Sequence, residues 1–184
     1  YEQTQDFILK GLKNIGFLSY YSQNTITVAD RVKGYEKALQ DNDILINKKY
    51  NLAQNEPKKP FSSVDKMGEY SVKLIEEYLT ENKDLQALII SNISWFNIII
   101  DSLRKLKLDN IKEIACFDMK EVSNSHKQRE IIGLIQKGRE MGKESVRILI
   151  SEMKNGQRYE HKKLPVDRVV YRLDDDGCWH PFSG

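Results

Sequence analysis

Three short apolar runs constrain the fold most, because each ends on a polar residue. They are residues 15–20 (IGFLSY), 87–92 (ALIISN) and 114–118 (IACFD). Each run is long enough for one strand and too short for a helix, and a helical pattern follows. This order is typical of β-α-β units. Ligands of open α/β sheets bind at the carboxyl ends of the strands, so the polar residues that end the runs are expected to converge on one crevice. These residues are Ser19, Asn92 and Asp118.

The segments between the runs predict amphipathic helices that cover the sheet. Val28, Val32, Tyr35 and Leu39 recur at helical spacing and give one buried stripe. Residues 67–78 and 96–106 carry similar stripes, and residues 44–46 (ILI) form a candidate second strand. The predicted fold class is therefore α/β, with a mostly parallel sheet flanked by helices.

Composition places the chain among ordinary globular proteins. Its 184 residues suit one domain, or one domain with an appendage. The 29 basic and 27 acidic residues nearly balance at a net charge of +2, unlike the basic footprint of a nucleic-acid-binding domain. No apolar run reaches membrane-spanning length and no signal peptide is visible, so no membrane contact is expected. The chain opens with Tyr1 rather than methionine, and we expect it to be part of a longer one.

Cysteine usage and the other reactive residues favour a binding module over an enzyme. Cys116 and Cys178 are too few for a disulfide framework, which fits a cytoplasmic protein and leaves a processed secreted chain open. The three histidines, His126, His161 and His180, lack metal-ligand spacing. The sequence has no phosphate-cradling glycine loop and no nucleophile elbow. We therefore predict no enzyme activity, no cofactor and no metal site.

Five stretches, taken in order, resemble the effector-binding domain of the lactose-repressor/galactose-repressor family of transcription regulators. They are residues 14–19 (NIGFLS), 31–39 (RVKGYEKAL), 87–92 (ALIISN), 114–118 (IACFD) and 135–142 (IQKGREMG). The likeness runs from the N-terminus to about Arg172. That domain shares its type I fold with periplasmic sugar-binding proteins, in which two α/β subdomains joined by crossing strands hold the ligand between them.

The resemblance implies a division of this chain into three parts. Residues 1–136 would form the C-terminal subdomain with one preceding helix, and residues 137–173 a helix and strands that return towards an N-terminal subdomain absent here. Residues 174–184 would be a tail. The apolar stripe of the helix at residues 138–153 would then fold back, meet another copy or stay exposed.

The resemblance also implies that Arg31, Asn92, Asp118 and Gln136 contact the effector. The planar fork of an arginine can donate two parallel hydrogen bonds to vicinal hydroxyls, an asparagine can both donate and accept, and a carboxylate accepts charge-assisted bonds. Other roles remain open at each position. Arg31 could be solvated, Asn92 could cap the following helix, Asp118 could belong to a turn, and Gln136 could be a surface residue.

Sugar sites commonly add an aromatic platform for the apolar face of the ring. Tyr20 and Tyr50 are candidates, as are Tyr21 and Trp95, and Tyr50 lies nearest to the family's usual location. The alternative for each ring is core packing.

By resemblance, the chain is expected to be the effector-sensing domain of a sugar-responsive transcription regulator. A sugar or sugar derivative would bind between the subdomains and modulate DNA binding by a separate head. Operator DNA would be contacted only through that N-terminal head, which is absent here, and the protein would be a cytoplasmic homodimer. The alternative is an extracytoplasmic sugar-binding protein of a transport or sensing system.

Overall fold

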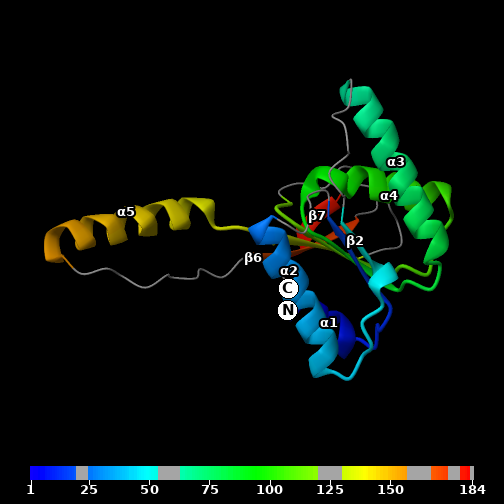
Figure 1. Cartoon of the computed structure of the whole chain (residues 1–184), viewed down its shortest axis with the longest axis horizontal. Helices are drawn as coiled ribbons and strands as arrows, with labels where there is room; N and C mark the ends of the chain where they lie inside the picture. Colours follow the sequence, from blue (N-terminus) through cyan, green and yellow to red (C-terminus); the bar gives the residue numbers. More distant parts are fainter. Residues whose placement is uncertain (20–24, 54–62, 120–129, 157–166, 174–178, 183–184) are drawn as a thin grey trace.

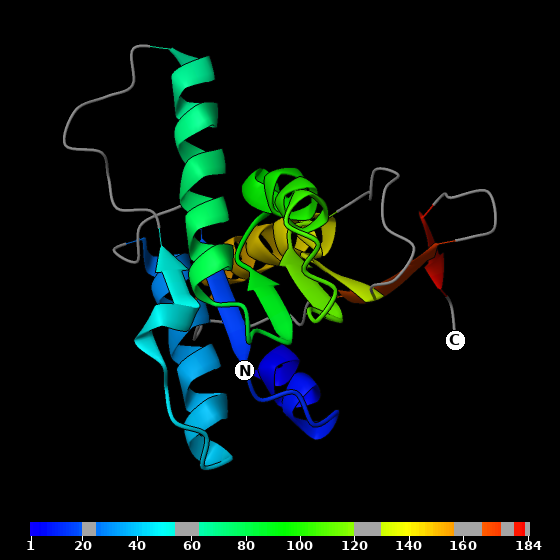
Figure 2. The ribbon, with the colours of Figure 1, turned by 90° about the vertical axis from the view of Figure 1, so that its right-hand side faces the viewer.

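The chain folds around one seven-stranded sheet, seen in Figures 1 and 2. The computed structural model describes residues 1–19, 25–53, 63–119, 130–156, 167–173 and 179–182. The strands lie in the order β2-β1-β3-β4-β5-β6-β7. Strands β1 to β5 are parallel, whereas β6 and β7 are added antiparallel. Their bounds are β1 Ile15–Ser19, β2 Asn51–Ala53, β3 Ala87–Ile90, β4 Glu113–Phe117, β5 Glu130–Ile135, β6 Asp167–Leu173 and β7 Trp179–Phe182.

Helices cover both faces of the parallel strands. The described helices are α1 Glu2–Leu9, α2 Ile26–Asp41, α3 Val64–Glu81, α4 Phe96–Lys105 and α5 Gly138–Asn155, with short 3-10 turns η1 Lys48–Tyr50 and η2 Ile93–Trp95. Helices α1 and α2 share a core with one face of the sheet, and α3 and α4 share a second core with the other. The predicted α/β class, a mostly parallel sheet flanked by helices, is confirmed.

Alternation along the strands divides the apolar residues between the two cores. Phe17 and Ile89 face α1 and α2, while their neighbours Leu18 and Ile90 face α3 and α4. All four are buried. Because both faces are covered, the strands read as unbroken apolar runs rather than as alternating ones.

The strand order creates a switch point between β1 and β3. The chain leaves β1 through α2 on one face and reaches β3 through α3 on the other, so the order of strands reverses between them. Such a reversal opens a crevice at the carboxyl ends of the two strands. Among the predicted binding residues, Asn92, Asp118 and Gln136 follow β3, β4 and β5, and Arg31 lies on α2.

The second strand differs from the prediction. Residues 44–46 are not a strand, and β2 lies instead at Asn51–Ala53, paired with β1. A turn with Asp43 at φ 55° brings the Ile44 N–H to within 2.9 Å of the Leu39 carbonyl oxygen. Ile44 and Ile46 then pack against the α1/α2 core from a loop. Their apolar character therefore reflects packing and not sheet pairing.

Two further elements were not predicted as strands. Strand β5 pairs in parallel with β4, and β7 lies within the stretch 174–184 that was predicted to be a tail. Helix α5 extends away from the sheet (Figure 1), and none of its residues is buried. Its exposed apolar residues are Met141, Val146, Leu149, Ile150 and Met153. Within the described residues, no helix has the length and apolar content needed to span a membrane.

Candidate ligand-binding site

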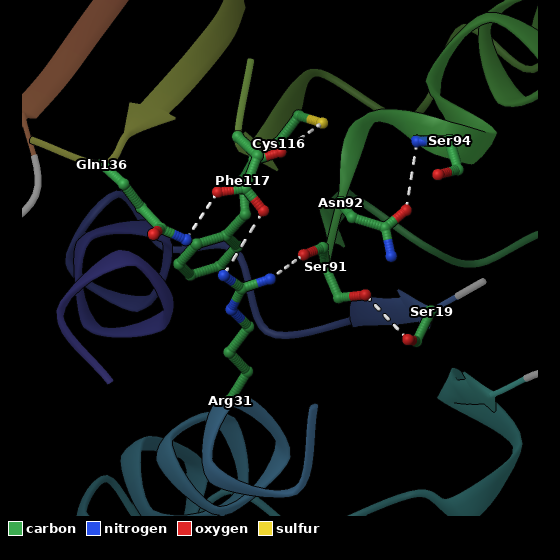
Figure 3. Close-up of polar contacts among 9 residues, drawn as sticks. Ser19, Arg31, Ser91, Asn92, Ser94, Cys116, Phe117 and Gln136 are labelled. Atoms are coloured by element: carbon green, nitrogen blue, oxygen red, sulfur yellow. Dashed lines mark hydrogen bonds and ion pairs between the residues drawn. The ribbon is translucent and has the colours of Figure 1, made fainter. Parts of the chain in front are cut away.

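Arg31 lies at the centre of a polar cluster at the carboxyl end of the sheet (Figure 3). Its guanidinium donates to the main-chain oxygen of Ser91, the residue that follows β3. The same group lies 3.5 Å from a carboxylate oxygen of Asp118. Its central carbon sits 4.3 Å from the centre of the Phe117 ring, a distance suited to a cation–π contact. Contacts from the carboxyl ends of two strands, β3 and β4, therefore fix the position of this guanidinium.

Asp118 bridges Arg31 and Gln136. It follows β4 with φ 62°, a left-handed conformation that aspartate adopts more readily than most residues. Its main-chain N–H donates to the Leu134 oxygen at 2.8 Å, which holds the turn against β5. The Gln136 amide donates to the second carboxylate oxygen at 2.7 Å. The carboxylate side chain is 37% exposed, so it remains open to a ligand.

Asn92 adjoins this cluster and caps the turn that follows β3. Its side-chain oxygen accepts from the Ser94 N–H at 3.1 Å, at the start of η2. Helix capping was the alternative role considered for this residue, and it is confirmed. The amide nitrogen is buried and has no hydrogen-bond partner among the described residues. Capping therefore uses the oxygen and leaves a donor available.

Two serine hydroxyls join the ends of β1 and β3. The Ser91 hydroxyl donates to that of Ser19 at 2.7 Å, and both residues are fully buried. The contact lies at the switch point and fixes the spacing of the two strand ends.

Sequence reasoning missed two contributors, Ser91 and Phe117. Ser91 acts through its main-chain oxygen, which no residue-type pattern could single out. Phe117 could have been considered, because it directly precedes Asp118 in the run 114–118 and an aromatic ring can lie under a guanidinium.

The aromatic platform prediction is not supported at Tyr50. Its hydroxyl donates to the carboxylate of Asp84, which precedes β3, whereas Ser91 follows that strand. Tyr50 therefore lies at the amino ends of the strands, whereas Arg31 lies at their carboxyl ends. Its ring packs in the α3/α4 core, and burial followed by the Asp84 hydrogen bond raises the pKa of its phenol. Tyr20 lies outside the described residues.

The cluster has one cation, one anion and neutral amides, an arrangement suited to hydroxyl groups. A hydroxyl can accept from the guanidinium and donate to the carboxylate at once, whereas a charged ligand would leave one of the two ions unbalanced. Among the residues that the structure describes, no three His, Cys, Asp or Glu side chains gather as metal ligands would. Nearby Cys116 is buried, and burial raises the pKa of its thiol.

Comparison with known proteins supports the fold from its three-dimensional shape. No protein-family model matches the chain, and no curated protein matches its sequence. Solved structures do match. A LacI-family regulatory protein from Chloroflexus aggregans has a TM-score of 0.67 at 16% identity, with 97% of this chain and 60% of that one covered. The fold is that of a LacI-family regulator.

Two other solved regulators agree. The transcriptional regulator CelR in its cellobiose complex has a TM-score of 0.65 at 16% identity, over 91% of this chain and 48% of that one. The dimeric Lac repressor with an 11-residue C-terminal deletion has a TM-score of 0.65 at 17% identity, over 90% and 57%. Our chain thus spans about half to three fifths of the length of these LacI-type structures.

Proposed function

We propose that this chain is the effector-sensing part of a sugar-responsive transcription regulator. The observation that carries the proposal is the meeting of Arg31 and Asp118 at the switch point of a sheet with the fold of LacI-family regulators. A small carbohydrate binds there and modulates DNA binding by a separate head. Coupling of this kind requires the sugar to bind one conformation of the whole protein more tightly than another.

The contact between Arg31 and Asp118 is suited to opening around a hydroxyl. The two side chains are 3.5 Å apart, at the outer limit for a hydrogen bond. A sugar hydroxyl placed between them donates to the carboxylate and accepts from the guanidinium. Neither charge then loses its compensation when the ligand enters, and both new bonds are charge-assisted.

Gln136 and Asn92 have supporting roles in this proposal. Gln136 holds one oxygen of Asp118 and so directs the other towards Arg31. The buried amide nitrogen of Asn92 offers a donor, and a ligand acceptor would remove the cost of leaving it unpaired.

The rest of the protein supplies the opposite wall of the site in this account. Residues 1–136 form one subdomain, and residues 137–173 return towards a second. The exposed apolar stripe of α5 and the coverage of only about half of CelR support this division. Homodimerisation, a cytoplasmic location and operator binding through a further domain are part of the same proposal.

The regulator is favoured over an extracytoplasmic sugar-binding protein. The compared solved structures are described as transcription regulators or repressors, and one of them is a complex with cellobiose. We propose no enzymatic activity for the chain.

Calorimetric titration of the whole protein with a panel of mono- and disaccharides tests the proposal. At least one sugar should bind. Arg31→Met or Asp118→Asn should lower the affinity for that sugar by about 10- to 100-fold, since each substitution removes charge-assisted bonds worth roughly 1.5–3 kcal/mol. The matched controls are Arg104→Met and Asp101→Asn, an exposed pair 3.6 Å apart on α4, which should leave affinity unchanged. Binding unaffected by the first two variants, or no binding across the panel, would reject the assignment.

A further inference from the structure

One asparagine of the sequence is followed directly by glycine, Asn155 before Gly156. Asn155 is the last residue of α5, and Gly156 caps that helix in the left-handed conformation at φ 65°. Both residues are exposed, and they lie at the end of α5 that extends away from the sheet (Figure 1). The pair takes no part in the polar cluster around Arg31.

An asparagine side chain can react with the main-chain nitrogen of the residue that follows it. The nitrogen attacks the side-chain carbonyl carbon, a new C–N bond closes a succinimide ring, and the side-chain nitrogen leaves as ammonia with the main-chain proton. Water then opens the ring and gives aspartate or isoaspartate. Glycine permits the attack most readily, since it has no Cβ beside the nitrogen. Isoleucine, whose branched side chain hinders the approach, follows Asn14, Asn92, Asn97 and Asn110.

The last turn of α5 holds both reacting groups in hydrogen bonds. The Gly156 N–H donates to the Glu152 main-chain oxygen at 2.9 Å. The side-chain nitrogen of Asn155 donates to the Ser151 hydroxyl at 3.3 Å. The attack requires the Gly156 N–H to lose its proton and the Asn155 amide to turn towards it, so both bonds must open first. The intact turn therefore slows the reaction.

This turn has little to keep it closed. None of the residues of α5 is buried, so no buried side chain anchors the helix within the part of the chain that the structure describes. Segments with few buried contacts open locally at low cost, and helix ends fray first. Each opening frees the main-chain nitrogen beside the Asn155 side chain.

We propose that Asn155 is a site of spontaneous deamidation, and that opening of the last turn of α5 sets its rate. The product carries a negative charge at the carboxyl end of the helix, where the helix dipole favours cations. Isoaspartate also adds a carbon to the main chain, which displaces the Gly156 N–H from Glu152. Deamidation therefore weakens the turn that slows it. The site is independent of the effector.

Incubation of the full chain at mildly alkaline pH, followed by peptide mass spectrometry, measures the rate at Asn155. We expect this residue to react before the other asparagines that the structure describes. Its reaction should be about five- to 100-fold slower than in a synthetic peptide of residues 150–160, since two hydrogen bonds must open in the folded chain.

Two matched serine substitutions test whether the fold controls the rate. Ser151→Ala removes the acceptor for the Asn155 amide and should speed the reaction by about two- to tenfold. Ser145→Ala is the control, because the Ser145 hydroxyl donates to the Met141 main-chain oxygen at 2.8 Å, nearly three turns before Asn155. Both substitutions raise helix propensity equally, so the control should not speed the reaction.

Asn155→Asp reproduces one product and gives a readout that does not depend on the reaction. Hydrogen exchange in the last turn of α5 should be about two- to fivefold faster in this variant. Three results would overturn the proposal: no product at Asn155 when the peptide has reacted completely, equal rates in the folded chain and the peptide, or equal rates for Ser151→Ala and Ser145→Ala. Unchanged exchange in Asn155→Asp would refute the weakening of the turn.

Discussion

The replacement Gly16→Ala should destabilise the fold strongly, because β1 passes very close to α3 at this residue. A Cβ at position 16 would lie 2.5 Å from the Tyr78 hydroxyl oxygen and 2.7 Å from a methyl carbon of Leu88. Both distances are shorter than van der Waals contact allows. The Tyr78 hydroxyl also donates to the Tyr50 main-chain oxygen at 2.8 Å, which ties α3 to the start of β2.

The cost of Gly16→Ala follows from two contributions. Overpacking a filled core costs about 1–3 kcal/mol. Displacing Tyr78 breaks a buried hydrogen bond that contributes about 0.5–1.5 kcal/mol and leaves the Tyr50 carbonyl unsatisfied. The sum is about 1.5–4.5 kcal/mol, which for a chain of this size lowers the thermal midpoint by roughly 3–18 °C.

Urea and thermal unfolding followed by circular dichroism measure this loss. The control is Gly68→Ala within α3, where an added Cβ has no neighbour within 4 Å. Alanine there should stabilise the helix by about 0.5–1 kcal/mol. If Gly16→Ala is as stable as the natural sequence, β1 does not approach α3 as closely as these distances indicate.

Three further predictions concern burial and chain direction. The Cys116 thiol, buried and with a raised pKa, should resist iodoacetamide at pH 8 in the native protein and react in urea, as peptide mass spectrometry would show; native labelling at the rate of a free thiol would refute its burial. Burial raises the pKa of Tyr35 and Tyr78, so the stabilisation from keeping both phenols protonated is complete below about pH 10 and is lost as the pH rises further. The free energy of unfolding measured from pH 8 to 11.5 should fall at the alkaline end, and less steeply in Tyr78→Phe. An identical slope in that variant would show that burial of Tyr78 does not contribute to the loss of stability. Gly156 ends α5 at φ 65°, so Gly156→Ala should destabilise the end of this helix by roughly 1 kcal/mol and reduce its helicity. Unchanged hydrogen exchange in α5 would contradict this prediction.

Local patterns predicted the parallel sheet and the place of Asp118 at its carboxyl end, whereas Arg31 was expected at the site from the family resemblance. Apolar runs buried on both faces are recognisable as strands of a parallel sheet, and strand ends point to the site. The buried face of α2 was predictable in the same way, since Val28, Val32 and Tyr35 are buried as their spacing indicates.

The failures have physical causes of a different kind. Strand β2 has three residues, and its pairing with β1 is set by tertiary contacts rather than by an apolar run. Residues 44–46 are apolar because a loop packs on the core. Tyr50 was assigned to the ligand as an aromatic residue near the family's usual location, yet its hydroxyl donates to Asp84 at the amino ends of the strands. Burial and partner choice depend on the whole fold, and no local pattern reports them.

A crystal structure of the whole protein with the tightest-binding sugar of the panel would show whether Arg31 and Asp118 hold the ligand. We expect sugar hydroxyls within hydrogen-bond distance of both the Arg31 guanidinium and the Asp118 carboxylate, at the carboxyl ends of β1, β3 and β4. A sugar bound elsewhere, with the direct contact between Arg31 and Asp118 unchanged, would contradict it.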